Sequence, residues 1–240
     1  MGWALKYGVA PEFCDEDLSW EPHLDNAILL ESPVAPDIMS NEVRHFVEGL
    51  DRRLCNIFAD LQAFGSVANK LVYSRRKLRP DLFQEIMLSI QYRLMLLEFD
   101  LGDHPIEEAI RLGLLSFQTS VFIQMKAIRV KYDYIMERLR TALSQFPETT
   151  PGLMDLKLWV HFMAAIALYD PAQVWLEDTI CRMTAGRSWE EVHQAMRSIM
   201  WLDLVHDAPG QMVYNSARCK LDEIDLGLGR DRTGFLDFGG

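Results

Sequence analysis

The sequence predicts an all-α fold, and three observations support this class. From residue 40 onward, apolar side chains recur at spacings of three and four residues, which places them on one face of a helix. Few segments show the strict alternation of apolar and polar residues that is typical of a half-buried strand. Proline, glycine and capping residues stand at the ends of the periodic segments. With 240 residues, of which 49% are hydrophobic, the chain can bury the core of one domain without a metal or a disulfide.

Residues 1–35 form the first predicted region, an irregular flank without sustained periodicity. The stretch 12–25 mixes aromatic residues with six acids and has no lysine or arginine; the acids are Glu12, Asp15, Glu16, Asp17, Glu21 and Asp25. Such a mixture is typical of transcriptional activation segments. The alternative is an acidic flank whose aromatic side chains dock onto the folded domain.

Residues 36–220 form the predicted helical domain, which opens with a long helix over residues 41–71. We expect a break in this helix near Gly65, because glycine weakens a helix interior. The basic stretch 74–79 (S-R-R-K-L-R) follows and ends at Pro80. It predicts an exposed connection between helices, and the alternative is a nuclear-import signal or a phosphate-binding patch.

Two segments in the middle of the domain are apolar around most of the helix circumference. They cover residues 106–128 and 152–169, and each begins beside a proline, Pro105 and Pro151. A helix that is apolar on all sides is covered by neighbours on all sides, so the pattern predicts two central helices. Amphipathic helices are expected around them, over residues 81–99, 132–146 and 171–185.

The last predicted helix begins at Ser188, after a glycine C-cap at Gly186. Ser188 and Glu191 have the spacing of a capping box, in which both side chains satisfy free backbone donors at a helix start. We expect the regular helix to end in a polar turn just before Pro209. Residues 221–240 are rich in glycine and predict a disordered tail.

Charge and cysteine usage exclude several function classes. The chain has 24 basic and 35 acidic residues, and a net charge of -11 disfavours direct contact with nucleic acids and with phospholipid surfaces. The four cysteines are widely separated, which predicts reduced thiols in an intracellular protein. The longest apolar run is too short to span a bilayer, and the first residues contain no apolar segment typical of a secretion signal.

One polar cluster suggests catalysis. Asp203, His206 and Asp207 resemble the His-Asp step of all-α metal-dependent phosphohydrolases, in which these residue types hold divalent ions. Such a site needs another histidine upstream, for which His161 and His193 are candidates, and an aspartate well downstream, where only the tail follows. The simpler interpretation is structural, because Asp and His side chains often bind local backbone groups at helix ends.

Three segments together resemble a known family. They are residues 104–117 (H-P-I-E-E-A-I-R-L-G-L-L-S-F), residues 156–167 (L-K-L-W-V-H-F-M-A-A-I-A), and S-W-E-E-V at 188–192 with W-L-D-L-V-H-D-A-P-G at 201–210. Their order and separation are similar to those in the helical regulatory domain of fungal zinc binuclear-cluster transcription factors, over residues 26–215. The family's DNA-binding cluster of six cysteines has no counterpart among the four cysteines of this chain.

The resemblance implies a non-enzymatic, nuclear domain that regulates transcription, in some family members for the gene cluster of one pathway such as secondary metabolism. It implies an all-α scaffold for contacts with the transcriptional machinery or co-regulators, with no catalytic residue, cofactor or metal and without direct DNA binding. It leaves a homodimer open. The alternatives are the metal-dependent hydrolase at Asp203, His206 and Asp207, or a ligand sensor with its pocket between the two central helices.

Overall fold

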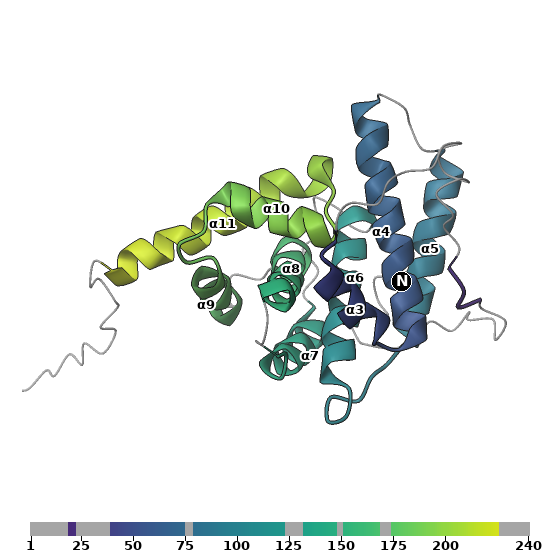
Figure 1. Ribbon diagram of the computed structural model, residues 1–240, viewed down its shortest axis with the longest axis horizontal. Coiled ribbons are helices and arrows are strands. Elements are labelled where there is room, and N and C mark those ends of the chain that lie inside the picture. Colours follow the sequence, from purple (N-terminus) through teal and green to yellow (C-terminus); the bar gives the residue numbers. More distant parts are fainter. Residues whose placement is uncertain are drawn as a thin grey trace, which may run out of the picture.

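The computed structural model describes residues 19–22, 39–74, 79–122, 132–147, 151–168 and 174–225. Within these ranges every regular element is a helix, which confirms the all-α class (Figure 1). The helices are α3 (Asn41–Glu48), α4 (Arg52–Tyr73), α5 (Pro80–Leu96), α6 (Pro105–Phe122), α7 (Asp133–Ser144), α8 (Pro151–Leu168), α9 (Val174–Met183), α10 (Trp189–Ile199) and α11 (Asp203–Asp225). Most of the acidic flank 1–35, residues 75–78 of the basic connection and the tail from 226 lie outside the described residues.

The first predicted helix is in fact two helices, and the break lies near Gly49 instead of Gly65. Gly49 is the C-cap of α3, and Asp51 is the N-cap of α4, where its carboxylate accepts a hydrogen bond from the backbone N–H of Arg53 at 2.8 Å. A capping aspartate satisfies a backbone donor that the helix leaves free, and thereby fixes the new start. Gly65 is buried in the middle of α4.

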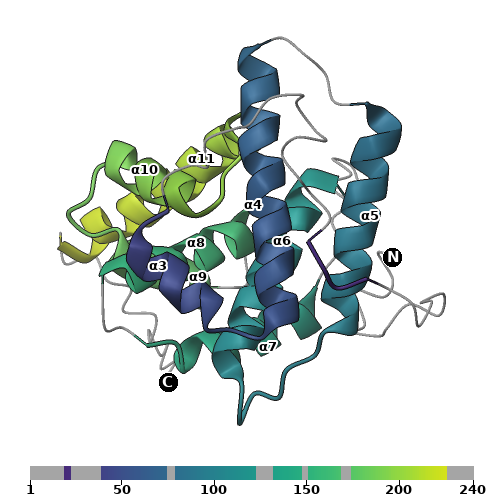
Figure 2. The same ribbon diagram turned by 45° about the vertical axis from the view of Figure 1, so that its right-hand side comes forward.

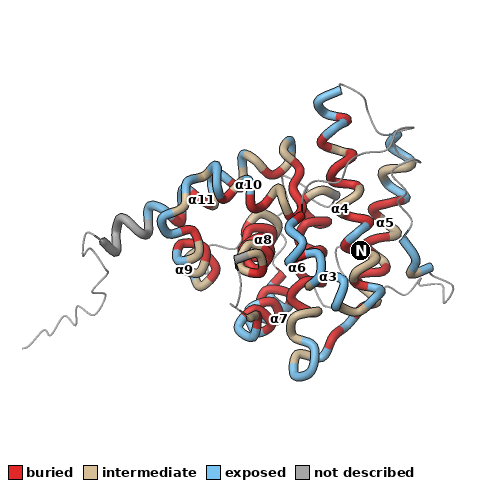
Figure 3. The backbone as a smooth tube through the Cα atoms, viewed as in Figure 1, coloured by how far each residue is buried: buried red, intermediate tan, exposed pale blue. Residues whose placement is uncertain are grey.

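Helices α6 and α8 lie at the centre of the molecule, as the sequence predicts. Helix α6 packs against α4, α5, α7 and α8, and α8 packs against α3, α6, α7, α9, α10 and α11. Figure 2 shows α4 and α5 on one side of this pair and α10 and α11 on the other. Both central helices are buried over most of their described length (Figure 3).

The contact between α6 and α8 is close because α6 carries a glycine there. A β-carbon on Gly113 would lie 2.9 Å from Val160 Cγ2 and 3.2 Å from Trp159 Cζ3, both in α8. Trp159 is fully buried, and its ring lies 6.3 Å from that of Phe117 in α6. These side chains fill the space between the two central helices, where the ligand-sensor alternative expects a pocket.

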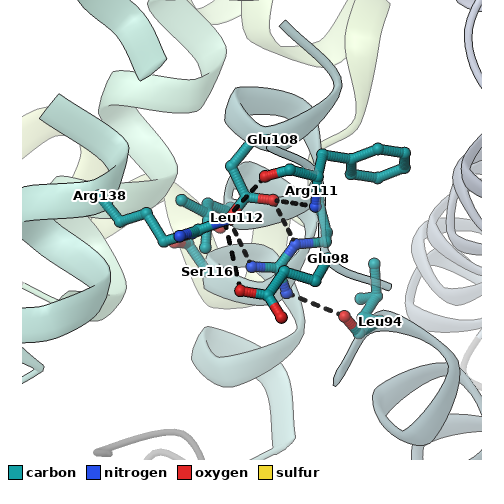
Figure 4. A network of polar contacts seen from close by, with 8 residues as sticks. Leu94, Glu98, Glu108, Arg111, Leu112, Ser116 and Arg138 are labelled. Atoms are coloured by element: carbon teal, nitrogen blue, oxygen red, sulfur yellow. Dashed lines mark hydrogen bonds and ion pairs between the residues drawn. The ribbon is translucent and has the colours of Figure 1, made fainter. Parts of the chain in front are cut away.

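A buried carboxylate joins α5, α6 and α7 (Figure 4). Glu108 of α6 accepts two hydrogen bonds from Arg111, at 2.6 and 2.7 Å, and another from Arg138 of α7. The same arginines donate to the carbonyls of Leu94 and Phe99. Burial alone raises the pKa of Glu108, but the hydrogen bonds and charges of the two arginines outweigh burial and lower its pKa overall.

The region around Asp203 differs from the predicted turn. The Ser188 capping box is present and Gly186 has a φ of 75°, but α10 ends at Ile199 and a new helix, α11, begins at Asp203. Helix α11 continues through Pro209 to Asp225, beyond the expected helical boundary at residue 220. Pro209 removes one helical donor, and the helix persists because α11 packs against α8 and α9.

Candidate functional site at the junction of α10 and α11

The backbone that links α10 to α11 is held by side chains from the core. Asn69 of α4 donates a hydrogen bond to the carbonyl of Trp201 at 2.8 Å and accepts one from the N–H of Asp203 at 3.0 Å. Trp159 of α8 donates its indole N–H to the carbonyl of Met200. Asn69 therefore satisfies a free backbone donor at the start of α11, although it lies far away in sequence.

His206 also belongs to this structural support. Its Nδ1 accepts a hydrogen bond from the N–H of Leu202 at 3.0 Å, which leaves the proton of the neutral ring on Nε2, facing Ser120 Oγ at 2.8 Å. The side chain is fully buried between the rings of Phe117 and Trp201. Burial lowers the pKa of His206 to about 3. Both ring nitrogens have partners, so His206 stabilises the start of α11 and is not free to bind the metal ion of the hydrolase alternative.

The histidine that meets Asp207 is His193 of α10. His193 Nε2 lies 2.9 Å from Asp207 Oδ1, and the same oxygen accepts a hydrogen bond from the indole N–H of Trp201 at 2.7 Å. The ring of Trp189 stacks on His193 with a centroid distance of 5.3 Å. His193 and Asp207 are both partly exposed, with 24% and 48% of their side-chain surface accessible. Unlike His206, this pair can therefore meet a molecule from solvent.

Asp203 lies beside this pair, one helical turn before Asp207. Its Oδ2 accepts a hydrogen bond from the hydroxyl of Tyr73 at 2.8 Å, and this bond raises the pKa of Tyr73. Its Oδ1 is 3.3 Å from Arg197 Nε, but this buried oxygen accepts no hydrogen bond. Asp203 is thus only partly satisfied by its surroundings.

Together, His193, Asp203 and Asp207 form the candidate site. One ligand-type atom from each lies within 4.8 Å of the others, and among the described residues they are the one group of this kind. Of the two upstream histidines considered from sequence, His161 is instead buried in α8, where Nδ1 lies 2.7 Å from the carbonyl of Lys157. Sequence reasoning missed Tyr73 and Arg197, because only the tertiary fold brings them to Asp203.

A separate apolar cavity opens between α8, α9 and α11, with a volume of about 340 Å³. Aliphatic residues line most of it, and Ser216 hydrogen-bonds Glu177 at its edge. This cavity touches only one of the two central helices. The cavity lies beside α8, whereas the ligand-sensor alternative places its pocket between α6 and α8.

No described helix has both the length and the apolar character needed to cross a bilayer.

Comparisons of the chain with protein-family models, with curated proteins and with solved structures give no match.

Proposed function

We propose that this chain is a non-enzymatic regulatory domain that acts in transcription in the nucleus, through contacts with co-regulators or the transcriptional machinery. The proposal starts from the three segments that resemble the regulatory domain of zinc-cluster factors. In the fold these segments are the first part of α6, most of α8, and the α10–α11 junction. They are far apart in sequence and meet in one core.

The observation that carries the proposal is the way these segments contact one another. Phe117, at the end of the first segment, packs against Trp159 of the second and His206 of the third, with ring distances of 6.3 and 5.2 Å. Trp159 also binds the backbone at Met200, next to the third segment. A shared pattern is more informative when its parts form one packed unit than when they are separate helices.

The surface offers a place for protein contacts at the ends of α4 and α11. Leu204, Tyr73 and Val72 are exposed to 77%, 71% and 45%. Leu204 and Val72 line an apolar hollow of about 430 Å³ together with the partly buried Phe83 and Val205. We call these residues the α4–α11 surface. Exposed apolar clusters of this kind are typical of protein-interaction sites.

A reporter assay tests this function. Residues 1–240 are fused to a foreign DNA-binding domain, and the proposal expects activation or repression of the reporter. Leu204→Asp should abolish most of that effect, whereas Tyr134→Asp, which changes an exposed aromatic residue on α7, should preserve it. An inactive fusion without any nuclear partner, or equal effects of the two variants, would contradict the proposal.

The hydrolase alternative is a second proposal, favoured by the proximity of His193, Asp203 and Asp207. It must use His193 in place of His206, whose nitrogens both have partners. We expect a phosphomonoesterase assay with added Mn²⁺ or Zn²⁺ to show activity that Asp207→Asn removes, if this alternative holds. Activity that is absent, or unchanged in the variant, would refute it.

A further inference from the structure

The α10–α11 junction brings together three side chains that commonly bind metals. Asp203 and Asp207 are four residues apart on α11, so they share a face of the helix, and His193 reaches them from α10. We propose that His193, Asp203 and Asp207 bind one divalent transition-metal ion through an imidazole nitrogen and two carboxylate oxygens. The inference does not depend on the regulatory function proposed above.

The distances in the cluster suit such an ion. Zinc bonds to nitrogen and oxygen of about 2 Å in a tetrahedral arrangement place neighbouring ligand atoms about 3.3 Å apart. The atoms of this cluster lie within 4.8 Å of one another, and His193 Nε2 is already 2.9 Å from Asp207 Oδ1. An ion that binds here replaces the His193–Asp207 hydrogen bond and takes the place of the imidazole proton.

The donor set selects a class of metal. One imidazole and two carboxylates suit Zn²⁺, Mn²⁺, Co²⁺ and Ni²⁺, whereas Ca²⁺ and Mg²⁺ prefer oxygen ligands alone. Three protein ligands leave further positions for water. The negative net charge of -11 attracts cations in general, but the histidine gives preference to the transition metals.

The surrounding residues hold the ligands in place. Tyr73 donates a hydrogen bond to Asp203 Oδ2, Trp201 donates one to Asp207 Oδ1, and Trp189 stacks on His193. Hydrogen bonds from an outer shell orient metal ligands in this way in known sites. Asp203 Oδ1 is buried without a hydrogen bond and so retains a free lone pair for the ion.

Arg197 is the competing cation. Its Nε lies 3.3 Å from Asp203 Oδ1, and 41% of its side-chain surface is exposed. In the absence of a metal ion, the guanidinium therefore balances the negative charge of the carboxylate, and it can turn into solvent when an ion binds. The positive end of the α11 dipole also opposes a cation, which makes two carboxylates necessary.

A titration of the full chain tests the site. The protein is treated with a chelator, dialysed, and titrated with Zn²⁺ by calorimetry and with Co²⁺ by visible absorption. We expect saturable binding of one equivalent and a higher melting temperature with metal. His193→Ala and the nearly isosteric Asp207→Asn should abolish saturable binding. His104→Ala, which alters an exposed histidine paired with Glu107, should leave it unchanged.

Two further results identify the ligands. Cys219 is exposed, so thiolate binding must be distinguished, and the site predicts a cobalt spectrum without the near-ultraviolet charge-transfer band of a thiolate. Arg197→Gln should tighten metal binding about tenfold, the size expected for removing one charge about 5 Å from a divalent ion in a water-like dielectric. Folding of each variant is checked by circular dichroism. The proposal would be overturned if the wild type does not bind metal, if the cobalt spectrum shows a thiolate band, or if folded His193→Ala and Asp207→Asn bind metal with the affinity of the wild type.

Discussion

His206 is a neutral histidine in a core position, and its protonation is therefore coupled to folding. Burial lowers its pKa from 6.5 to about 3, and the neutral ring both accepts and donates a hydrogen bond. In the unfolded chain the same imidazole has its ordinary pKa. Below that pKa the unfolded state binds more protons than the folded state, so the free energy of unfolding decreases as the pH is lowered.

The contribution of His206 is complete above pH 6.5 and decreases as the pH falls toward 3. At about pH 5 the expected loss is about 2 kcal/mol relative to neutral pH. We expect His206→Asn to be less stable than the wild type at neutral pH, because it makes fewer of these hydrogen bonds. Its deficit should shrink by about the same 2 kcal/mol at about pH 5. Urea unfolding at both pH values measures this difference. The prediction would be refuted if the two proteins differ in unfolding free energy by the same amount at both pH values.

Glu108 presents the opposite case, a charge that stays ionised in the core because two arginines surround it. Glu108→Gln removes the negative charge and replaces one of the two acceptor oxygens by an NH2 group, so Arg111 and Arg138 lose their common counter-ion. Because breaking a buried ion pair leaves uncompensated charge, the variant should lose about 3 kcal/mol of unfolding free energy.

Glu107→Gln is the matched control for this prediction. Glu107 is the neighbouring residue, but it contacts an exposed histidine, His104, at 3.4 Å. An ion pair of this kind contributes little, so the control should lie within about 0.5 kcal/mol of the wild type. Denaturant titration compares the two variants, and equal losses would show that the buried network does not carry the stability assigned to it.

At the scale of secondary-structure elements, the start of α11 depends on another helix. Asn69 makes two hydrogen bonds to the backbone of the junction, to Trp201 and Asp203. Asn69→Ala leaves the carbonyl of Trp201 and the N–H of Asp203 without this partner. We expect a loss of about 2 kcal/mol, larger than one hydrogen bond contributes.

The effect of Asn69→Ala should also be local. Hydrogen exchange is expected to become faster in residues 200–207 before it changes in α4 itself. Gln62→Ala provides the control, because Gln62 of α4 makes one longer hydrogen bond to a backbone carbonyl here, that of Ile199 at 3.2 Å, and a weak one to the sulfur of Met39. It should cost about 1 kcal/mol or less. Unchanged exchange at the junction in Asn69→Ala would contradict this role.

Across the whole molecule, the sequence predicts those elements whose ends are determined locally. Pro80, Pro105 and Pro151 mark helix starts that the structure confirms, and the Ser188 capping box is formed. The sequence does not predict the break before α4, because the apolar stripe continues across it and only the caps Gly49 and Asp51 mark it.

The candidate site shows the limit of local reasoning more clearly. Pro209 predicts a helix end, but packing against α8 and α9 overrides this preference. The sequence identifies Asp203 and Asp207 as part of a polar cluster with His206, but the histidine that meets Asp207 is His193, one of the two upstream candidates. It could not assign Tyr73 or Arg197 to Asp203, because those contacts arise from how α4, α10 and α11 pack in three dimensions.

The close contact of α6 and α8 should determine the stability of the whole molecule, because every other described helix packs on one of these two. In Gly113→Ala the new methyl group would lie 2.9 Å from Val160 Cγ2. We expect a net loss of about 1–2 kcal/mol, since overpacking exceeds the gain in helix propensity from replacing glycine.

Val160→Ala alone should cost about 2 kcal/mol, because it leaves a cavity at the same contact. In the double variant the methyl group of residue 113 occupies part of that cavity and meets no valine. The two losses should then combine to less than their sum, with a coupling of about 1 kcal/mol. Urea unfolding of the four proteins measures this cycle. Additive losses would mean that Val160 does not restrict the space at residue 113. If the variants leave the midpoint of global unfolding unchanged, α6 and α8 are not the common core.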